Sequence, residues 1–137
     1  MSGVFLDTAP LIYLLEGASA LRVAVHEQLK IWIEGNVPLY SSVLTLTELL
    51  VPAKRDNNSG LIYQYKTSLG KLLSGPLYPI DELQAERAAE IRAEYGIATP
   101  DALQLSAAMA LGCDGFYTND RRLCKVNDIE MILVSTG

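Results

Sequence analysis

The stretch Gly3-Val4-Phe5-Leu6-Asp7-Thr8 decides the fold, because it predicts a short buried strand that ends on a carboxylate. Apolar residues fill the strand, and Asp7 comes directly after the last of them. A carboxylate at the end of a buried strand is unusual for a core residue. In open α/β sheets, ligands bind just beyond the carboxyl ends of the strands. We therefore expect Asp7 to belong to a site.

Beyond this strand, apolar runs of strand length alternate with longer segments of helical periodicity. We expect further strands at 38–40, 77–80, 116–117 and 131–134, the third strand of the chain being an edge or end strand because it contains a proline. Helices are expected on both sides of Gly17, then over about 42–54, 61–73, 81–95 and 99–111, with a short helical turn at 120–123. The alternation predicts a three-layer α/β/α sandwich around a central, mostly parallel sheet.

Capping signals mark several of the helix starts. Ser19 can cap the second helix, and Asp81 with Gln84 resembles a capping box. The sequence Thr99-Pro100-Asp101 is a strong start, with a cap, a proline at the first helical position and an acid in the first turn.

The totals favour one domain over residues 1–137. Half of the 137 residues are hydrophobic, which is enough for a single core, and no interior linker or repeat divides the chain. The sequence has no apolar run of about 18 residues and no signal-peptide pattern, so neither a membrane span nor export is expected. The scattered Cys113 and Cys124 suggest reduced thiols, so we expect a cytoplasmic protein.

The formal net charge of −5 bears on the partners that the chain can bind. It argues against a protein that coats nucleic acid, since phosphate binding depends on Lys and Arg. A carboxylate–metal site would change this balance, because each bound divalent ion brings two positive charges to the acids. The acidity also fits a basic partner.

Two aspartates follow predicted strands. Asp7 ends the first one, and Asp120 comes after Phe116-Tyr117-Thr118-Asn119. Each can simply cap the helix that follows, a frequent role of aspartate. The alternative is that both are metal ligands, with the hydroxyl of Thr8 holding a ligand carboxylate in place.

Two further acids interrupt apolar helices. Glu48 is the only charged residue between Val37 and Ala53, and it shares a helix face with Thr45. It must be exposed, neutralised or bound to a cation, because an unpaired buried carboxylate is costly. Asp101 has the simpler explanation of a favourable acid near a helix N-terminus. Four converging acids would repel one another, and a hard divalent cation with oxygen ligands is the usual resolution.

Four segments together resemble the PIN domain, and more narrowly the VapC-like toxin nucleases of toxin–antitoxin pairs. They occur in the order and spacing of that family and are the segments 4–8, 41–49, 99–103 and 116–120. The resemblance spans nearly the whole chain and is weakest between Val51 and Pro79. It implies a Mg²⁺- or Mn²⁺-dependent endoribonuclease that forms a homodimer and binds a cognate antitoxin.

The resemblance also implies roles for single residues. The acidic metal ligands of the family correspond to Asp7, Glu48, Asp101 and Asp120, and its hydroxyl before the last acid corresponds to Thr118. Many members have Asn or Ser after the first Asp-Thr, whereas this chain has Ala9, so one polar contact is absent. Candidates for contacts with the RNA backbone are the nearest basic residues: Lys54, Arg55, Arg121, Arg122 and Lys125.

Other functions fit the sequence less well. A haloacid-dehalogenase site needs a second aspartate where Ala9 stands, a receiver domain needs an upstream acidic pair and a late lysine, and no glycine-rich phosphate loop is present. The main alternative is a non-catalytic module that binds a basic peptide in an acidic pocket. The helix over 61–73, with Tyr63 and Tyr65, is the predicted partner or dimer face.

Overall fold

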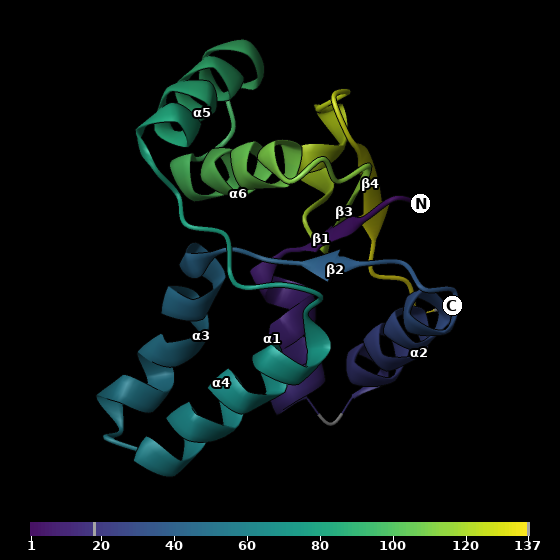
Figure 1. The fold of residues 1–137 in the computed structure, drawn as a ribbon, viewed down its shortest axis with the longest axis vertical. Helices are drawn as coiled ribbons and strands as arrows, with labels where there is room; N and C mark the ends of the chain where they lie inside the picture. The colour runs from purple at the N-terminus through teal and green to yellow at the C-terminus, as the bar shows by residue number, and fades with distance from the viewer. Residues whose placement is uncertain (18, 137) are drawn as a thin grey trace.

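The sheet has four strands, all parallel. In the computed structural model, which describes residues 1–17 and 19–136, they are β1 (Val4–Leu6), β2 (Leu39–Tyr40), β3 (Gly115–Thr118) and β4 (Glu130–Leu133). Their order across the sheet is β2-β1-β3-β4, so β1 and β3 lie side by side at the centre (Figure 1).

Six helices and one 3-10 turn connect the strands. They are α1 (Thr8–Glu16), α2 (Ala20–Glu34), α3 (Val43–Arg55), α4 (Ser59–Leu72), α5 (Glu82–Tyr95), α6 (Thr99–Ala110) and η1 (Arg121–Lys125). Figure 1 shows α5 and α6 on one side of the sheet and α1 to α4 on the other. The predicted α/β/α sandwich is thus confirmed.

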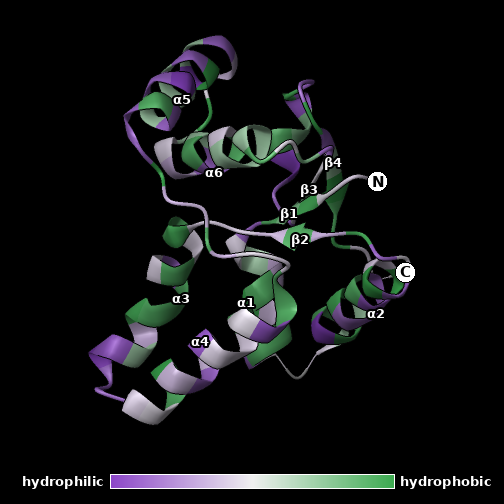
Figure 2. Ribbon diagram, viewed as in Figure 1, coloured by the Kyte–Doolittle hydropathy of each residue, from purple (hydrophilic) through white to green (hydrophobic). Residues whose placement is uncertain are grey.

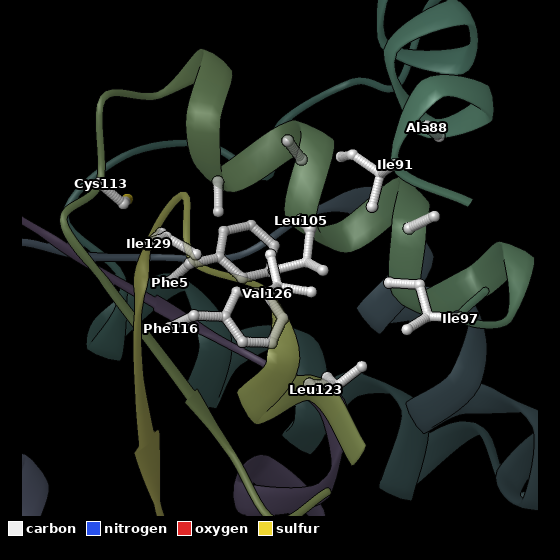
Figure 3. Packing of buried hydrophobic residues seen from close by; sticks show 13 residues of the cluster. Phe5, Ala88, Ile91, Ile97, Leu105, Cys113, Phe116, Leu123, Val126 and Ile129 are labelled. Carbon is white, nitrogen blue, oxygen red and sulfur yellow. The ribbon is translucent and has the colours of Figure 1, made fainter. Parts of the chain in front are cut away.

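Alternation along β1 feeds two separate cores. Phe5 points to the α5–α6 side, whereas Val4 and Leu6 point to the side of α1 and α2, as expected for successive strand residues. On the first side the rings of Phe5 and Phe116 stack with centroids 5.4 Å apart. Figure 3 shows these rings between Leu105 of α6 and Leu123 of η1. The side chains of Val4, Phe5, Leu6 and Phe116 are all fully buried.

The second core lies between the sheet and the helices α1 to α4. Trp32 of α2 meets Tyr117 of β3 edge-on, with ring centroids 5.0 Å apart. Figure 2 shows mostly hydrophobic colour along α1 and α6, whereas the outer helix α5 carries many hydrophilic residues. The two cores hold β1 and β3 from both faces and fix the positions of their carboxyl ends.

The strand expected at 77–80 does not form. Only Tyr78 makes an isolated parallel bridge, to Ser42, and the rest of the segment is irregular. The physical reason is that Pro76 and Pro79 flank this bridge without N–H groups to donate, so no ladder can extend from it.

Two of the predicted caps differ from the structure. Ser19 precedes α2 without making a side-chain cap, and Ala98 rather than Thr99 is the cap residue of α6. The Thr99 hydroxyl instead accepts a hydrogen bond from the Arg92 guanidinium at 3.0 Å. Asp81 does cap α5, where its Oδ1 accepts from the backbone N–H of Gln84 at 3.2 Å.

Both cysteines are free thiols, Cys113 buried and Cys124 exposed. Among the described residues, no single helix is long and apolar enough to cross a membrane, and only the bent pair α1 and α2, taken together, reaches the required length and composition.

Candidate active site

The site begins where β1 and β3 end. The two strands pair in parallel with Leu6 opposite Tyr117, and the backbone N–H of Asp7 donates to the Tyr117 carbonyl at 2.9 Å. The next residue of β3 therefore lies beside Asp7, and the Thr118 hydroxyl donates to Asp7 Oδ2 at 2.8 Å. Asp120 follows two residues later, at the same edge of the sheet.

All four predicted carboxylates line one cavity of about 370 Å³. They come from four separate segments: the ends of β1 and β3, the middle of α3 and the first turn of α6. The remaining lining residues are hydroxyl, amide and apolar side chains: Thr8, Ala9, Ile12, Tyr13, Pro100, Gln104, Thr118 and Asn119. The predicted convergence of the acids on one place is therefore observed, whereas their role as ligands stays a prediction.

Asp7 is the most perturbed carboxyl group of the cavity. Burial raises its pKa from 3.8 to about 6. Hydrogen bonds from the Thr118 hydroxyl and the Thr8 backbone oppose this rise, and the charges of Asp101 and Glu48 add to it. Asp7 also caps α1, so the simple structural interpretation holds as well. A cation beside Asp7 would stabilise its charged form.

Asp101 lies half-buried in the first turn of α6. Burial raises its pKa, and the nearby charge of Asp120 raises it further, whereas Arg122 lowers it. Among the described residues no hydrogen bond contributes to the pKa of Asp101. Its carboxylate oxygens are therefore open toward the cavity.

Glu48 is exposed, which is the first of the three outcomes that its sequence context allowed. Its Oε1 accepts a hydrogen bond from the Thr8 hydroxyl at 2.7 Å. The sequence predicted that Thr8 could hold a ligand carboxylate, and the carboxylate that it holds through its hydroxyl is Glu48, from a different helix.

Asp120 is held by a cation of its own chain. Its Oδ2 lies 2.7 Å from Arg122 Nη2, and its Oδ1 accepts from Arg122 Nε at 3.0 Å. These contacts lower the pKa of Asp120. Arg122 was predicted as a phosphate contact, but in the structure its guanidinium faces this carboxylate.

The other sequence candidates lie at the surface or away from the cavity. The remaining predicted RNA contacts, Lys54, Arg55, Arg121 and Lys125, are exposed. On α4, Tyr63 is 72% exposed, as a partner face requires, whereas Tyr65 is buried and donates its hydroxyl to Glu16 at 2.6 Å. The predicted partner helix thus offers only one of its two tyrosines.

Sequence reasoning missed the buried polar side chains beneath the acids. Gln104 of α6 is 1% exposed and donates to the hydroxyl of Thr45 on α3 at 2.6 Å. Its carbonyl accepts a hydrogen bond from the hydroxyl of Ser42. One signal was present in the sequence: Gln104 is the only polar residue in the run Ala102-Leu103-Gln104-Leu105.

The donors that surround the cavity suit a hard divalent ion, because they are carboxylate and hydroxyl oxygens with no thiol or imidazole among them. Within the described ranges 1–17 and 19–136, no three His, Cys, Asp or Glu side chains are arranged to hold an ion as they stand. Asp120 shows why, since both of its oxygens are turned to Arg122. The donor set suits such an ion in kind, and binding would require the side chains to move together.

Comparisons with known proteins agree with this architecture. The sequence profile of the PIN domain matches residues 4–129. A search of curated protein sequences finds no significant match.

Several solved structures share the fold. A toxin–antitoxin complex from Klebsiella pneumoniae is 23% identical, with a TM-score of 0.74 and 98% of each chain covered. VapBC2 from Rickettsia felis, bound to a DNA fragment from its promoter, is 17% identical, with a TM-score of 0.73 and coverage of 96% of this chain and 98% of that one. FitAcB from Neisseria gonorrhoeae is 23% identical, with a TM-score of 0.71 and coverage of 94% and 96%. At these identities the likeness establishes the fold alone.

Proposed function

Because this chain belongs to the PIN domain family, we propose that it is a Mg²⁺- or Mn²⁺-dependent endoribonuclease and the toxin of a toxin–antitoxin pair. One observation carries the nuclease assignment: four carboxylates from four segments of the chain line one cavity, where burial and neighbouring charge raise the pKa of Asp7 to about 6. Perturbed carboxyl groups in a cleft are typical of functional sites.

The proposed ligands of the ion are Asp7, Glu48, Asp101 and Asp120. When bound, a divalent ion makes a coordinated water more acidic and stabilises charge on a phosphate. Thr118 orients Asp7 by donating to its Oδ2, and Thr8 orients Glu48 by donating to its Oε1. Within residues 1–17 and 19–136 no hydrogen bond to Asp101 competes, so its carboxylate could turn toward the ion.

The partners belong to the same proposal. The solved structures from Klebsiella pneumoniae and Rickettsia felis are complexes of a toxin with its antitoxin, which supports an antitoxin as the protein partner of this chain. We also propose that the substrate is RNA and that the protein is a homodimer. Residues 1–137 would form one domain, and the compartment would be the cytoplasm. Free thiols such as Cys113 and Cys124 are stable in that compartment.

The test is cleavage of a defined single-stranded RNA by the purified protein with Mg²⁺ or Mn²⁺ and again with EDTA. We expect cleavage only with the metal, and at least about 100-fold slower cleavage by Asp101→Asn, because a ligand charge is lost. Asp114→Asn is the matched control, since Asp114 is exposed at the opposite end of β3 and binds the backbone of Ser2 and Gly3. A DNA strand of the same sequence tests the choice of RNA.

Two results would overturn this assignment: cleavage that persists in EDTA, or equal rates for Asp101→Asn and the wild type. Equal cleavage of the DNA strand would leave a nuclease but remove the preference for RNA.

A second candidate function rests on the contact of Arg122 with Asp120. That contact shows that the acidic edge of the cavity binds a guanidinium, as a module for basic peptides would. Binding of an arginine-containing peptide without any binding of Mn²⁺ would favour this module. Mn²⁺ binding that Asp7→Asn abolishes would favour the nuclease.

A further inference from the structure

A row of buried polar side chains connects α6 and α3 to the carboxylate of Glu48. Gln104, Thr45 and Ser42 are each 1% exposed or less, and Thr8 is 8% exposed. Groups buried this deeply need hydrogen-bond partners, and these side chains find them in one another. Ser42 also caps α3, whereas Gln104 and Thr8 line the cavity.

The direction of the hydrogen bonds is fixed at one end by the backbone. The N–H of Leu44 donates to Ser42 Oγ at 3.1 Å, so the Ser42 hydroxyl can give its own proton to the carbonyl of Gln104. This contact orients the amide of Gln104, and the NH₂ group faces Thr45 Oγ1 at 2.6 Å.

The other end of the row is fixed by the charge of Glu48. Thr8 has a single hydroxyl proton, and the short 2.7 Å contact places it on Glu48 Oε1. Thr8 Oγ1 also lies 3.4 Å from Thr45 Oγ1, with Thr8 again on the donor side, so these two acceptors compete for one proton. The NH₂ group of Gln104 already donates to Thr45 Oγ1, which leaves the Thr8 proton to Glu48.

We propose that Gln104 is a positioning residue of the ion site, because its amide donates to Thr45 Oγ1 and so leaves the Thr8 hydroxyl to hold Glu48 Oε1, with Oε2 open to the ion. The inference rests on the proposed function, since it assumes that Glu48 is a ligand. It adds Gln104 as a residue that prepares this ligand.

Loss of the Gln104 amide would leave Thr45 Oγ1 without this donor. Thr45 would then draw the Thr8 hydroxyl, which would hold Glu48 less firmly. A long exposed side chain then regains its rotamer freedom and must be ordered again when the ion binds. Removal of a group that orients a metal ligand typically costs about 10–100-fold in affinity, and we expect about tenfold here because Gln104 acts through two hydroxyls.

The experiment is Mn²⁺ binding by calorimetry to the wild type, Gln104→Met and Gln84→Met, with the free energy of unfolding of each measured in EDTA. Gln84 is the matched control, because it is also a buried glutamine, 5% exposed, on the adjacent helix α5 and outside the cavity. Within the described residues its Oε1 has no hydrogen-bond partner, so its loss should not touch the site.

We expect the Mn²⁺ affinity to fall about tenfold in Gln104→Met and to stay unchanged in Gln84→Met. Thr45→Val should bind Mn²⁺ as the wild type does, because valine has no acceptor to draw the Thr8 hydroxyl from Glu48, and the same change should restore the affinity of Gln104→Met. If the wild type binds Mn²⁺ and Gln104→Met binds it equally well, the positioning role is wrong while the ion site stands. If the wild type binds no Mn²⁺, the proposed function fails and this inference with it. These affinities are compared only among variants that remain folded, and Gln104→Asn, whose side chain is too short to reach both Ser42 and Thr45, provides the milder change if Gln104→Met unfolds.

Discussion

The ends of β1 and β3 each carry an aspartate at one edge of the sheet, yet the protein treats the two carboxyl groups in opposite ways. The pKa of Asp7 is raised to about 6 by burial, whereas contacts with Arg122 lower the pKa of Asp120. Asp7 has only neutral donors, from Thr8 and Thr118. The fold brings both carboxyl groups to the cavity. Arg122 supplies a positive charge to Asp120, whereas among the described residues Asp7 is bonded only by neutral groups.

The largest effect is expected from Asp7→Asn, which removes the uncompensated charge and keeps a side chain that Thr118 can bind. Cleavage of RNA should fall at least about 100-fold and Mn²⁺ binding should be lost, because Asp7 lies at the centre of the proposed ligand set. Rates from single-turnover cleavage and titration calorimetry measure the two effects. Unchanged binding in the variant would mean that Asp7 is a helix cap only.

The raised pKa of Asp7 should also make the stability of the protein depend on pH. A folded-state pKa of about 6 for Asp7, against the ordinary 3.8, means that folding favours the protonated acid. This stabilisation is fully present below pH 3.8 and is lost as the pH rises through 6. In EDTA, the free energy of unfolding of the wild type should therefore fall by about 2–3 kcal/mol relative to Asp7→Asn between pH 4 and pH 7.

Urea unfolding of both proteins at several pH values gives this difference directly. The other carboxyl groups are common to both proteins, so their contributions to the pH dependence largely cancel. A difference that stays constant with pH would contradict the raised pKa of Asp7.

The smallest effect is expected at the other strand end. Arg122→Gln should raise the affinity for Mn²⁺ by at most about fivefold, because an exposed ion pair is weak and Arg122 is 82% exposed. Arg121→Gln removes the same charge from the adjacent position, where no ion pair is seen among the described residues, and it controls for the general effect of charge. A weaker affinity in Arg122→Gln than in this control would show that Arg122 supports the ion site instead of competing for Asp120.

The sequence was most informative where the relevant structure is local. The apolar run before Asp7 and the run before Asp120 predict strands, and the parallel arrangement then places both acids at one edge. The prediction of a strand at 77–80 was wrong because it relied on the apolar residues of this segment. The two prolines around Tyr78 limit its pairing to one bridge.

What the sequence could not show depends on tertiary contact. Gln104 donates a hydrogen bond to Thr45, which is 59 positions away in the sequence, and the periodicity of α6 does not predict this partner. The pairing of Arg122 with Asp120 depends on the rotamer of an exposed side chain, which a charge pattern does not determine. The acids and the hydroxyls of Thr8 and Thr118 were therefore predictable from sequence, whereas Gln104 and the pairing of Thr8 with Glu48 were not.

The hydrogen bond from Thr118 to Asp7 joins positions 111 residues apart, and this distance has a consequence for the newly made protein. Contacts between residues so far apart in sequence form late in folding, because the entropy cost of closing a large loop comes before the stabilisation by the contact. A chain still in synthesis that has not yet reached β3 has neither Thr118 nor Asp120, so it cannot assemble the cavity. The order of synthesis thus keeps each growing chain without a complete acidic site until β3 and Asp120 have been made.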